Sequence, residues 1–267
     1  MDIITSKNNN KIKNLIKIRD NSKFRNEESL FYVEGERIIN DADIKLINGL
    51  FVAKSKFEQF KTLLDKFDKE IINIVDDDIF DKVKDTVNSQ GIIATVKYNN
   101  LKNLRAEDLK GYNRILILDG VNDPGNLGTI IRLSEASNVD LIILTDNCCN
   151  IYNTKVIRAC MGSIFRSNIY ISNNILDVVS KIKQSDFKIY STSLNDKSIK
   201  YTEINYKNRL CLVLGNEANG VSEKLLNVSD ETIIIPMCGK IESLNVSIAS
   251  AIILYEVMKQ NNFYEDK

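Results

Sequence analysis

An arginine follows a glycine-rich loop near the middle of the chain. Residues 118–144, LDGVNDPGNLGTIIRLSEASNVDLIIL, contain Gly120, Gly125, Gly128, one of the chain's two prolines, and Arg132. Because glycine has no side chain, a loop of this kind between an apolar run and a helix lets the backbone approach a ligand closely. The glycines are not spaced as GxGxxG, and no Gly-Lys-Ser or Gly-Lys-Thr follows them. Neither a dinucleotide-binding loop nor a P-loop is therefore favoured.

Two further loops follow apolar runs in the second half of the chain. Residues 212–222, LVLGNEANGVS, and residues 233–250, IIIPMCGKIESLNVSIAS, supply Gly215, Asn216, Glu217, Gly220, Pro236, Gly239, Ser243, Asn245 and Ser247. Each loop alone has an ordinary interpretation, since asparagine and glycine form turns and Ser243 can cap a helix. Three such loops at one edge of a sheet instead predict backbone amides and carbonyls that hold a heteroaromatic, sugar-bearing ligand.

Alternating apolar runs and helical patterns must position these loops. Strands are expected at residues 114–120, 139–145, 187–193, 210–215 and 232–237, and helices at residues 126–137, 153–162, 174–183, 222–228 and 243–260. This alternation predicts an α/β domain with a mostly parallel sheet that is covered by helices on both faces. Ligands of such sheets bind outside the carboxyl ends of the strands.

The first half of the chain predicts a separate, smaller α/β domain. Strands are expected at residues 30–39, 47–54, 70–75 and 91–98, with helices at 57–67, 76–87 and around Ile12, Leu15, Ile16 and Ile18. Gly35 is expected to end the first strand and to begin a helix. A polar segment follows, so we expect domains at residues 1–98 and 113–267 with a linker at residues 99–112.

The composition narrows the classes of function. The chain is 43% hydrophobic and 27% charged, as is typical of a globular protein. It contains no histidine, which argues against a zinc site and against histidine-based acid–base chemistry, and no metal is expected. Five cysteines without a CxxC motif predict reduced thiols. With no apolar run of membrane-spanning length and no signal peptide, the sequence predicts a cytoplasmic protein without a membrane partner.

Positive charge is concentrated near the start of the chain although the net charge is zero. The stretch ITSKNNNKIKNLIKIRDNSKFR, residues 4–25, carries one acidic residue, Asp20, against Lys7, Lys11, Lys13, Lys17, Arg19, Lys23 and Arg25. One interpretation is a surface that binds phosphates. The alternative is a solvated, lysine-rich helix face.

Together, the three loops resemble the three sequence motifs of the SpoU (TrmH-type) RNA ribose methyltransferases of the SPOUT class. NDPGNLGTIIR resembles motif one, LGNEANGVS motif two and IPMCGKIESLNVSIASAIILYE motif three, in the right order. The segments ITSKNNNKIKNL and FYVEGERII resemble the family's ribosomal-protein-like substrate-binding domain. YNTKVIRACMGSIFR resembles a family segment that usually has serine or alanine in place of Cys160.

The resemblance implies a deep trefoil knot in the second domain, whose loops hold S-adenosylmethionine. The cofactor-binding residues that it implies are Leu214, Gly215, Asn216, Ile235, Pro236, Met237, Ser243, Leu244 and Asn245. Gly215 and Gly239 are expected to let the chain pass close to this ligand. The implied reaction is methyl transfer to a ribose 2′-hydroxyl of RNA, of 23S ribosomal RNA in preference to transfer RNA.

The resemblance also assigns catalytic roles, to Asn126, Arg132, Glu217, Ser243 and Asn245. Arg132 is expected to bind the phosphate beside the target ribose and to stabilise developing alkoxide charge, while the proton acceptor stays open. Asn126 would orient the ribose or the guanidinium, Glu217 would hold Arg132 or its own loop, and Ser243 and Asn245 would position cofactor and target. The alternative for Arg132 is a surface arginine paired with Glu135.

Two kinds of partner are expected. RNA would bind through Lys7, Lys11, Lys13, Lys17 and Arg158. The last helix is apolar on nearly every side, which predicts burial or a shared surface, and the resemblance implies a homodimer through it. Two other functions stay open: a non-catalytic RNA-binding protein of this fold, and a nucleotide-dependent oxidoreductase, which the irregular glycine spacing disfavours.

Overall fold

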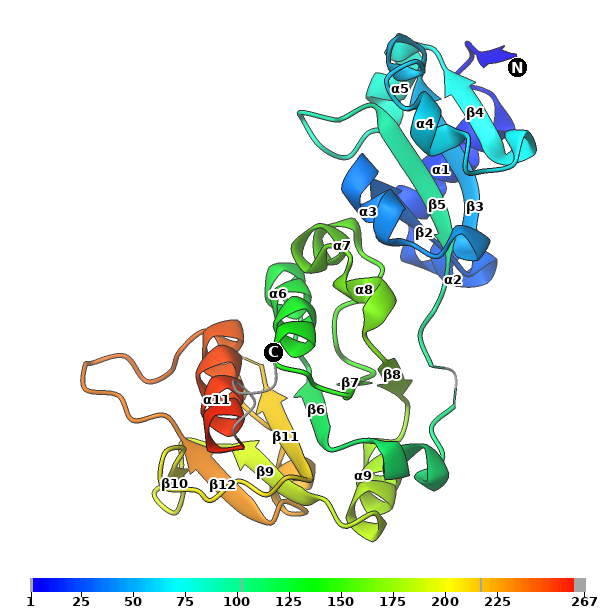
Figure 1. The fold of residues 1–267 in the computed structure, drawn as a ribbon. Helices are drawn as coiled ribbons and strands as arrows, with labels where there is room; N and C mark the ends of the chain where they lie inside the picture. Colours follow the sequence, from blue (N-terminus) through cyan, green and yellow to red (C-terminus); the bar gives the residue numbers. More distant parts are fainter. Residues whose placement is uncertain (1, 102, 217, 262–267) are drawn as a thin grey trace. The chain divides into compact units, whose positions relative to one another are not determined.

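A computed structural model describes residues 2–101, 103–216 and 218–261 of the chain (Figure 1). The described chain divides into two compact units. The first comprises residues 1–99 and 150–165, and the second comprises residues 100–149 and 166–267. Each unit contains its own sheet.

The first unit is built on a mixed five-stranded sheet in the order β1-β4-β3-β5-β2. Parallel pairing joins β1, β4 and β3, while β5 runs antiparallel to both β3 and β2. The strands are β1 (Ile3–Ile4), β2 (Leu30–Glu34), β3 (Ile47–Ala53), β4 (Ile72–Val75) and β5 (Ile92–Lys97). The helices among them are α1 (Asn10–Asp20), α2 (Ser22–Glu28), α3 (Glu36–Asp41), α4 (Lys61–Leu64) and α5 (Asp77–Val83).

Local sequence explains the first helix of this unit. Asn9 caps α1 by accepting a hydrogen bond from the Lys11 amide. Ile12, Leu15 and Ile18 recur on one face and are buried in the core against the sheet. Lys11, Lys13 and Lys17 are exposed. The expected helix at residues 57–67 is wrong in extent, because only α4 and short 3₁₀ turns form there.

Residues 150–165 pack with the first unit although they lie within the second half of the sequence. They contain α7 (Thr154–Cys160) and most of α8 (Ser163–Arg166). Tyr152 stacks on Phe31 and Tyr98, with ring centroids 4.5 and 3.8 Å away. The first unit is therefore assembled from two separate pieces of chain, and the domain boundaries expected from the sequence stay a prediction.

The second unit is built on a seven-stranded sheet in the order β10-β12-β9-β11-β6-β7-β8. Every neighbouring pair in it is parallel, as the sequence predicted. The strands are β6 (Arg114–Asp119), β7 (Leu141–Thr145), β8 (Ile169–Ser172), β9 (Lys188–Thr192), β10 (Ile199–Lys200), β11 (Leu210–Gly215) and β12 (Glu231–Ile234). The sequence interpretation missed β8 and β10, which are short and form the two edges of the sheet.

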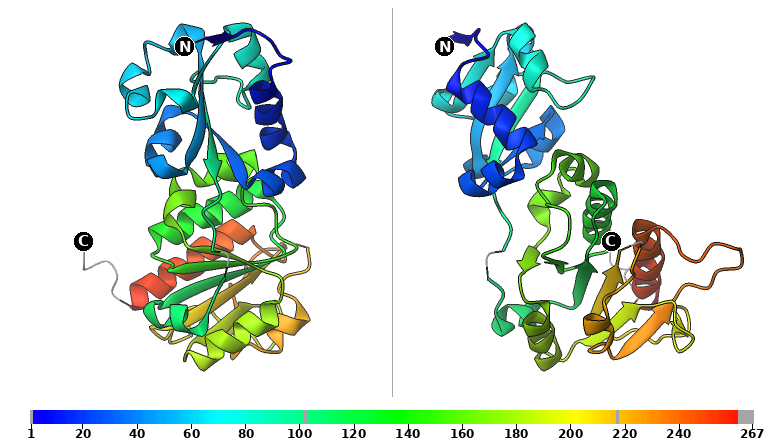
Figure 2. Two further views of the ribbon diagram at one scale, coloured as in Figure 1. Left: turned by 90° about the vertical axis from the view of Figure 1, so that its right-hand side faces the viewer. Right: turned by 180° about the vertical axis from the view of Figure 1, so that it is seen from behind.

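Helices cover both faces of this sheet, which confirms the expected α/β layering. They are α6 (Pro124–Ala136), α9 (Ile175–Gln184), α10 (Glu223–Leu226) and α11 (Val246–Gln260). Figure 2 shows α6 and α11 together on one face and α9 on the other. The polar segment before β6 contains the 3₁₀ helix η4 (Ala106–Gly111), and Leu104 and Leu109 are buried in the core beneath α9. The deep trefoil knot stays a prediction.

Candidate functional site

The first two motif loops lie side by side because β6 and β11 are adjacent parallel strands. Leu214 pairs with Leu118, and Gly215 pairs with Asp119, so both loops leave the sheet at the same level. The buried Asp119 carboxylate accepts a hydrogen bond of 2.8 Å from the Ser222 amide. This bond fastens the end of the β11 loop to the end of β6.

The β11 loop is a tight turn that folds back on its own strand. The Asn216 side-chain oxygen accepts hydrogen bonds from the amides of Ala218 (3.0 Å) and Asn219 (2.7 Å), and the Gly220 amide donates to the Asn216 carbonyl. A Cβ atom on Gly215 would lie 1.9 Å from the Gly220 carbonyl carbon. The space beside Gly215 is therefore filled by the chain itself, whereas a Cβ atom on Gly239 would meet no described atom within 4 Å.

The third loop ends at Asn245, which begins the last helix. Its side-chain oxygen caps α11 by accepting hydrogen bonds from the amides of Ser247 (2.9 Å) and Ile248 (3.3 Å). Its side-chain nitrogen donates to the Asn126 side-chain oxygen at 2.8 Å. Asn245, rather than Ser243, is the N-cap, and it joins the start of α11 to the first turn of α6.

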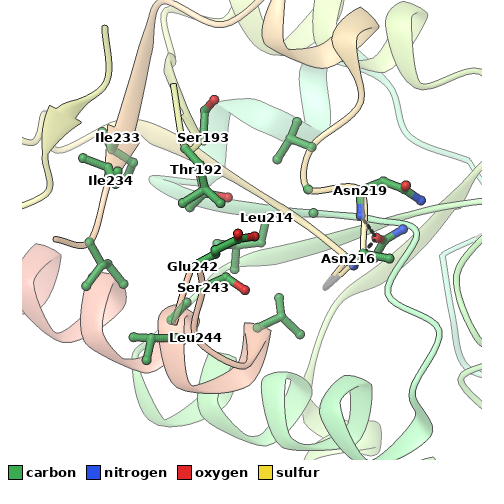
Figure 3. Close-up of a pocket in the computed structure, with 18 of the residues that line it drawn as sticks. Thr192, Ser193, Leu214, Asn216, Asn219, Ile233, Ile234, Glu242, Ser243 and Leu244 are labelled. Carbon is green, nitrogen blue, oxygen red and sulfur yellow. Dashed lines mark hydrogen bonds between the residues drawn. The ribbon is translucent and has the colours of Figure 1, made fainter. Parts of the chain in front are cut away.

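A cavity of about 340 Å³ lies between the ends of β9, β11 and β12 and the start of α11, and the first motif loop contributes no residue to its lining. Figure 3 shows the end of β9, Leu214 and the segment before α11 around a common space. The expected cofactor residues that line it are Leu214, Gly215, Asn216, Ile235, Met237, Ser243 and Leu244. Pro236 and Asn245 are not in this lining. The wall combines branched apolar side chains with a few hydroxyl and amide groups.

Sequence reasoning missed one wall of the cavity. Thr192, Ser193 and Leu194 line it from the end of β9, and Glu242 lines it beside Ser243. The signal was present, since the strand expected at residues 187–193 had to end at the same edge as its parallel neighbours. What the sequence could not supply was the order of strands, which places β9 next to β11.

Arg132 lies on α6 with an exposed side chain. Within the part of the chain that the structure describes, it forms no hydrogen bond or ion pair. The alternative that paired it with Glu135 is wrong, because Glu135 instead forms an ion pair with Arg166. Glu217, the other expected ionisable catalytic residue, lies outside the described residues.

The basic residues near the start of the chain divide into two groups. Arg19 and Arg25 are structural: Arg25 is buried and donates to the carbonyls of Ile18 and Arg19. The RNA-binding candidates Lys7, Lys11, Lys13 and Lys17 are exposed. The Lys11 ammonium donates to Asn73 at 2.6 Å, and Arg158, the remaining RNA-binding candidate, forms an ion pair with Asp85.

Cys160, at the position where the resemblance implies serine or alanine, is buried at the end of α7. Its thiol donates to the Ile157 carbonyl at 3.5 Å, and burial raises its pKa to about 12. It acts as a small packed donor and is not a nucleophile at neutral pH.

No helix within the described ranges is both long and apolar enough to cross a bilayer, and no group of three or more metal-ligating His, Cys, Asp or Glu residues occurs among them.

Comparisons with known proteins agree with this geometry. The model of the SpoU rRNA Methylase family matches residues 113–255, and that of the MRM3-like substrate binding domain matches residues 9–94. The 23S rRNA (guanosine(2553)-2'-O)-methyltransferase RlmP of Bacillus subtilis is 30% identical over 259 residues, which are 96% of this chain and 99% of that protein.

Solved structures extend the likeness to the whole fold. The AdoMet-bound rRNA methyltransferase from Sinorhizobium meliloti matches with a TM-score of 0.84 at 26% identity and covers 97% of both chains. The SpoU methyltransferase AviRb from Streptomyces viridochromogenes, in complex with AdoMet, matches with a TM-score of 0.82 and covers 95% of this chain and 98% of that one. At 21% identity the second match shows the fold alone.

Proposed function

The chain belongs to the SpoU rRNA methylase family, and from that membership we propose that it methylates a ribose 2′-hydroxyl of 23S ribosomal RNA with S-adenosylmethionine. It is an RNA methyltransferase. The observation that carries the proposal is that the second and third motif loops line one cavity, and that Asn245, at the end of the third loop, donates a hydrogen bond to Asn126 of the first motif. Arg132 lies on the same helix as Asn126 and forms no hydrogen bond or ion pair within the described chain.

The cavity fits the cofactor. Its volume of about 340 Å³ is in the range of small-molecule sites, and Leu214, Ile235 and Leu244 supply apolar walls for an adenine ring. The hydroxyls of Thr192 and Ser243 and the backbone around Gly215 supply polar partners for a ribose and an amino-acid group. When bound, S-adenosylmethionine supplies a methyl group that a positive sulfur already activates.

The chain's own contribution is alignment and charge stabilisation. Arg132 binds the phosphate next to the target ribose through its planar fork and stabilises the developing oxyanion, since no described side chain competes for it. Asn126 is held in place by Asn245, which in turn is fixed by capping α11. We therefore assign Asn245 the role of positioning the first turn of α6. Ser243 lines the cavity, so we assign it to binding the cofactor.

The first unit binds the RNA. Lys7, Lys13 and Lys17 are exposed and form a basic face whose affinity for phosphates falls with salt. Lys11 is a poor test of this face, because its contact with Asn73 also supports the sheet. Lys17 has a contact as well, since its ammonium lies 5.1 Å from the centre of the Phe24 ring. The sharper variant is Lys7→Glu with Lys13→Glu, which weakens RNA binding and leaves cofactor binding unchanged. The RNA substrate is the reason that we assign the protein to the cytoplasm.

The last helix completes the assembly as a homodimer. It packs on α6 and β11, but Ile248 and Tyr255 remain 52% and 45% exposed. Large apolar side chains on one helix mark an interaction surface. We propose that a second copy covers them. Sedimentation of the protein and of Ile248→Glu at micromolar concentration tests this: a dimer that the variant converts to a monomer supports it, and a monomeric parent protein contradicts it.

One experiment tests the activity itself. Purified protein is incubated with methyl-labelled S-adenosylmethionine and either 23S ribosomal RNA or transfer RNA, and the labelled nucleotide is mapped. A 2′-O-methyl group on 23S RNA supports the proposal. If only transfer RNA is labelled, the substrate is transfer RNA and the assignment to 23S RNA is wrong. If the protein binds cofactor and RNA but transfers no methyl group, the non-catalytic alternative is favoured.

A further inference from the structure

A second cavity, of about 460 Å³, lies within the first unit and has no part in the cofactor site. It is enclosed by the end of β2, the start of α3, the segment between α5 and β5, and helix α7. Its lining includes Arg37, Ile38, Thr86, Asn88, Ile157 and Met161, together with Glu34, Asp85 and Arg158. Both pieces of chain that form the first unit contribute to it.

The acidic groups of this cavity are already engaged. The Glu34 carboxylate accepts hydrogen bonds from the Tyr32 hydroxyl (2.9 Å), the Asp85 amide (2.8 Å) and both the amide (3.3 Å) and hydroxyl (2.6 Å) of Thr86. Asp85 pairs with Arg158. These contacts join the segment that follows α5 to β2 and to α7, so the acidic groups of the cavity already have partners within the protein.

Other groups at the cavity are available to a ligand. The side chains of Arg37 and Asn88 are exposed, and neither forms a hydrogen bond or ion pair within the described chain. Ile38 and Ile157 are buried and supply apolar surface. Met161 also lines the cavity and has a φ of 54°, a strained backbone conformation for a residue with a side chain. Such strain is often found at binding sites.

We propose that this cavity holds one unstacked base of the RNA substrate, an inference that rests on the proposed function. Proteins read single-stranded RNA by placing splayed bases between side chains and by bonding to their polar edges. Ile38, Ile157 and Met161 offer the apolar contact, and Asn88 offers both a donor and an acceptor. The carboxylates of Glu34 and Asp85 disfavour a phosphate at this position, whereas they tolerate an uncharged base. Arg37, at the cavity, then binds the flanking phosphate.

The chain contains no tryptophan, so a single introduced tryptophan reports on the cavity. In Thr154→Trp the indole stands at a lining position that has no role in recognition. In the control Ile44→Trp it replaces an exposed side chain outside the cavity. Each full-length variant is titrated with the four nucleoside monophosphates and with ribose 5-phosphate, which lacks a base. We expect at least one nucleotide to quench the fluorescence of Thr154→Trp. Ribose 5-phosphate should not quench it, and no probe should quench Ile44→Trp. Quenching by ribose 5-phosphate alone, or by no probe, overturns the proposal.

A second measurement connects the cavity to the enzyme. Arg37→Glu removes a cation at the cavity that has no partner within the described chain, whereas the other lining cation, Arg158, is paired with Asp85. Lys45→Glu makes the same charge change at an exposed position outside the cavity. We expect Arg37→Glu to raise the KM for RNA about tenfold with kcat retained, and Lys45→Glu to change it little. Equal effects of the two variants overturn the proposal. If the parent protein methylates no RNA, the proposed function fails, but the fluorescence titration still tests whether the cavity binds a nucleotide.

Discussion

The tightest steric constraint in the cofactor site is at Gly215, and it makes a sharp prediction. In Gly215→Ala the new Cβ atom would lie 1.9 Å from the Gly220 carbonyl carbon, 2.0 Å from its oxygen and 2.2 Å from the Val221 nitrogen. All three atoms belong to the backbone, so no side chain can rotate away. Ordinary contact begins near 3.4 Å, so the loop has to withdraw by about 1.5 Å, the difference between the two distances.

This displacement has a cost in stability and in affinity. Overpacking of this kind costs about 1–3 kcal/mol, which lowers the Tm of a unit of this size by about 5 °C. The withdrawn backbone of Gly220 and Val221 also lines the cofactor cavity. We therefore expect the affinity for S-adenosylmethionine to fall about tenfold, the equivalent of about 1.4 kcal/mol.

The matched control is Gly239→Ala, in the loop that crosses the same cavity. Its Cβ atom would meet nothing within 4 Å, so the change in stability should stay within about 0.5 kcal/mol. Because the chain has no tryptophan, thermal unfolding is followed by far-ultraviolet circular dichroism, and affinity is measured by calorimetry. Parent-like Tm and affinity in Gly215→Ala, or an equal loss of Tm in Gly239→Ala, would refute the steric argument.

Three further predictions follow from the site. Arg132→Ala should abolish methyl transfer to RNA while the Tm and the calorimetric affinity for S-adenosylmethionine stay at parent values, because the exposed guanidinium supports no described residue; a large Tm loss would contradict this. Asn245→Ala should cost about 0.5–2 kcal/mol by removing the N-cap of α11. Asn245→Ser should keep the parent free energy of unfolding in urea, because serine supplies a cap oxygen. It should nevertheless lower kcat, because it loses the side-chain nitrogen that donates to Asn126. At pH 8, Cys160 should not react with a disulfide reagent, because burial raises its pKa to about 12 and keeps the thiol protonated. The exposed Cys238 should react quickly, and Cys238→Ser should remove this fast phase of the reaction. A fast phase that persists in Cys238→Ser would contradict its assignment to Cys238.

Local sequence patterns predicted most of the second unit. The apolar runs of β6 and β11 are buried along their whole length, as central strands of a parallel sheet must be, and the loops after them therefore lie where the sequence placed them. The strand β8 was missed because Ile169–Ser172 has only four residues, two of them partly or fully exposed, and polar residues flank it. No period can be read from so short an edge strand.

Long-range packing could not be predicted from the sequence. Tyr152 stacks on residues that precede it by more than fifty positions, and residues 150–165, which contain it, pack with the first unit. The cavity wall at Thr192 likewise depends on β9 lying beside β11, although β10 and the segment after it separate them in the chain. In both cases the outcome depends on which elements are neighbours in space, and the spacing of apolar residues along the chain does not predict this.

Gly215 and Arg132 were both predicted as site residues, but the structure gives them different physical reasons. Gly215 is required by the chain, because the backbone of Gly220 and Val221 occupies the place of a side chain before any ligand is considered. Arg132 is not required by the described chain, since removing its side chain breaks no bond there, and its role toward a ligand stays a prediction. The two substitutions should therefore separate: loss of the glycine lowers stability and cofactor affinity together, and loss of the arginine lowers turnover alone.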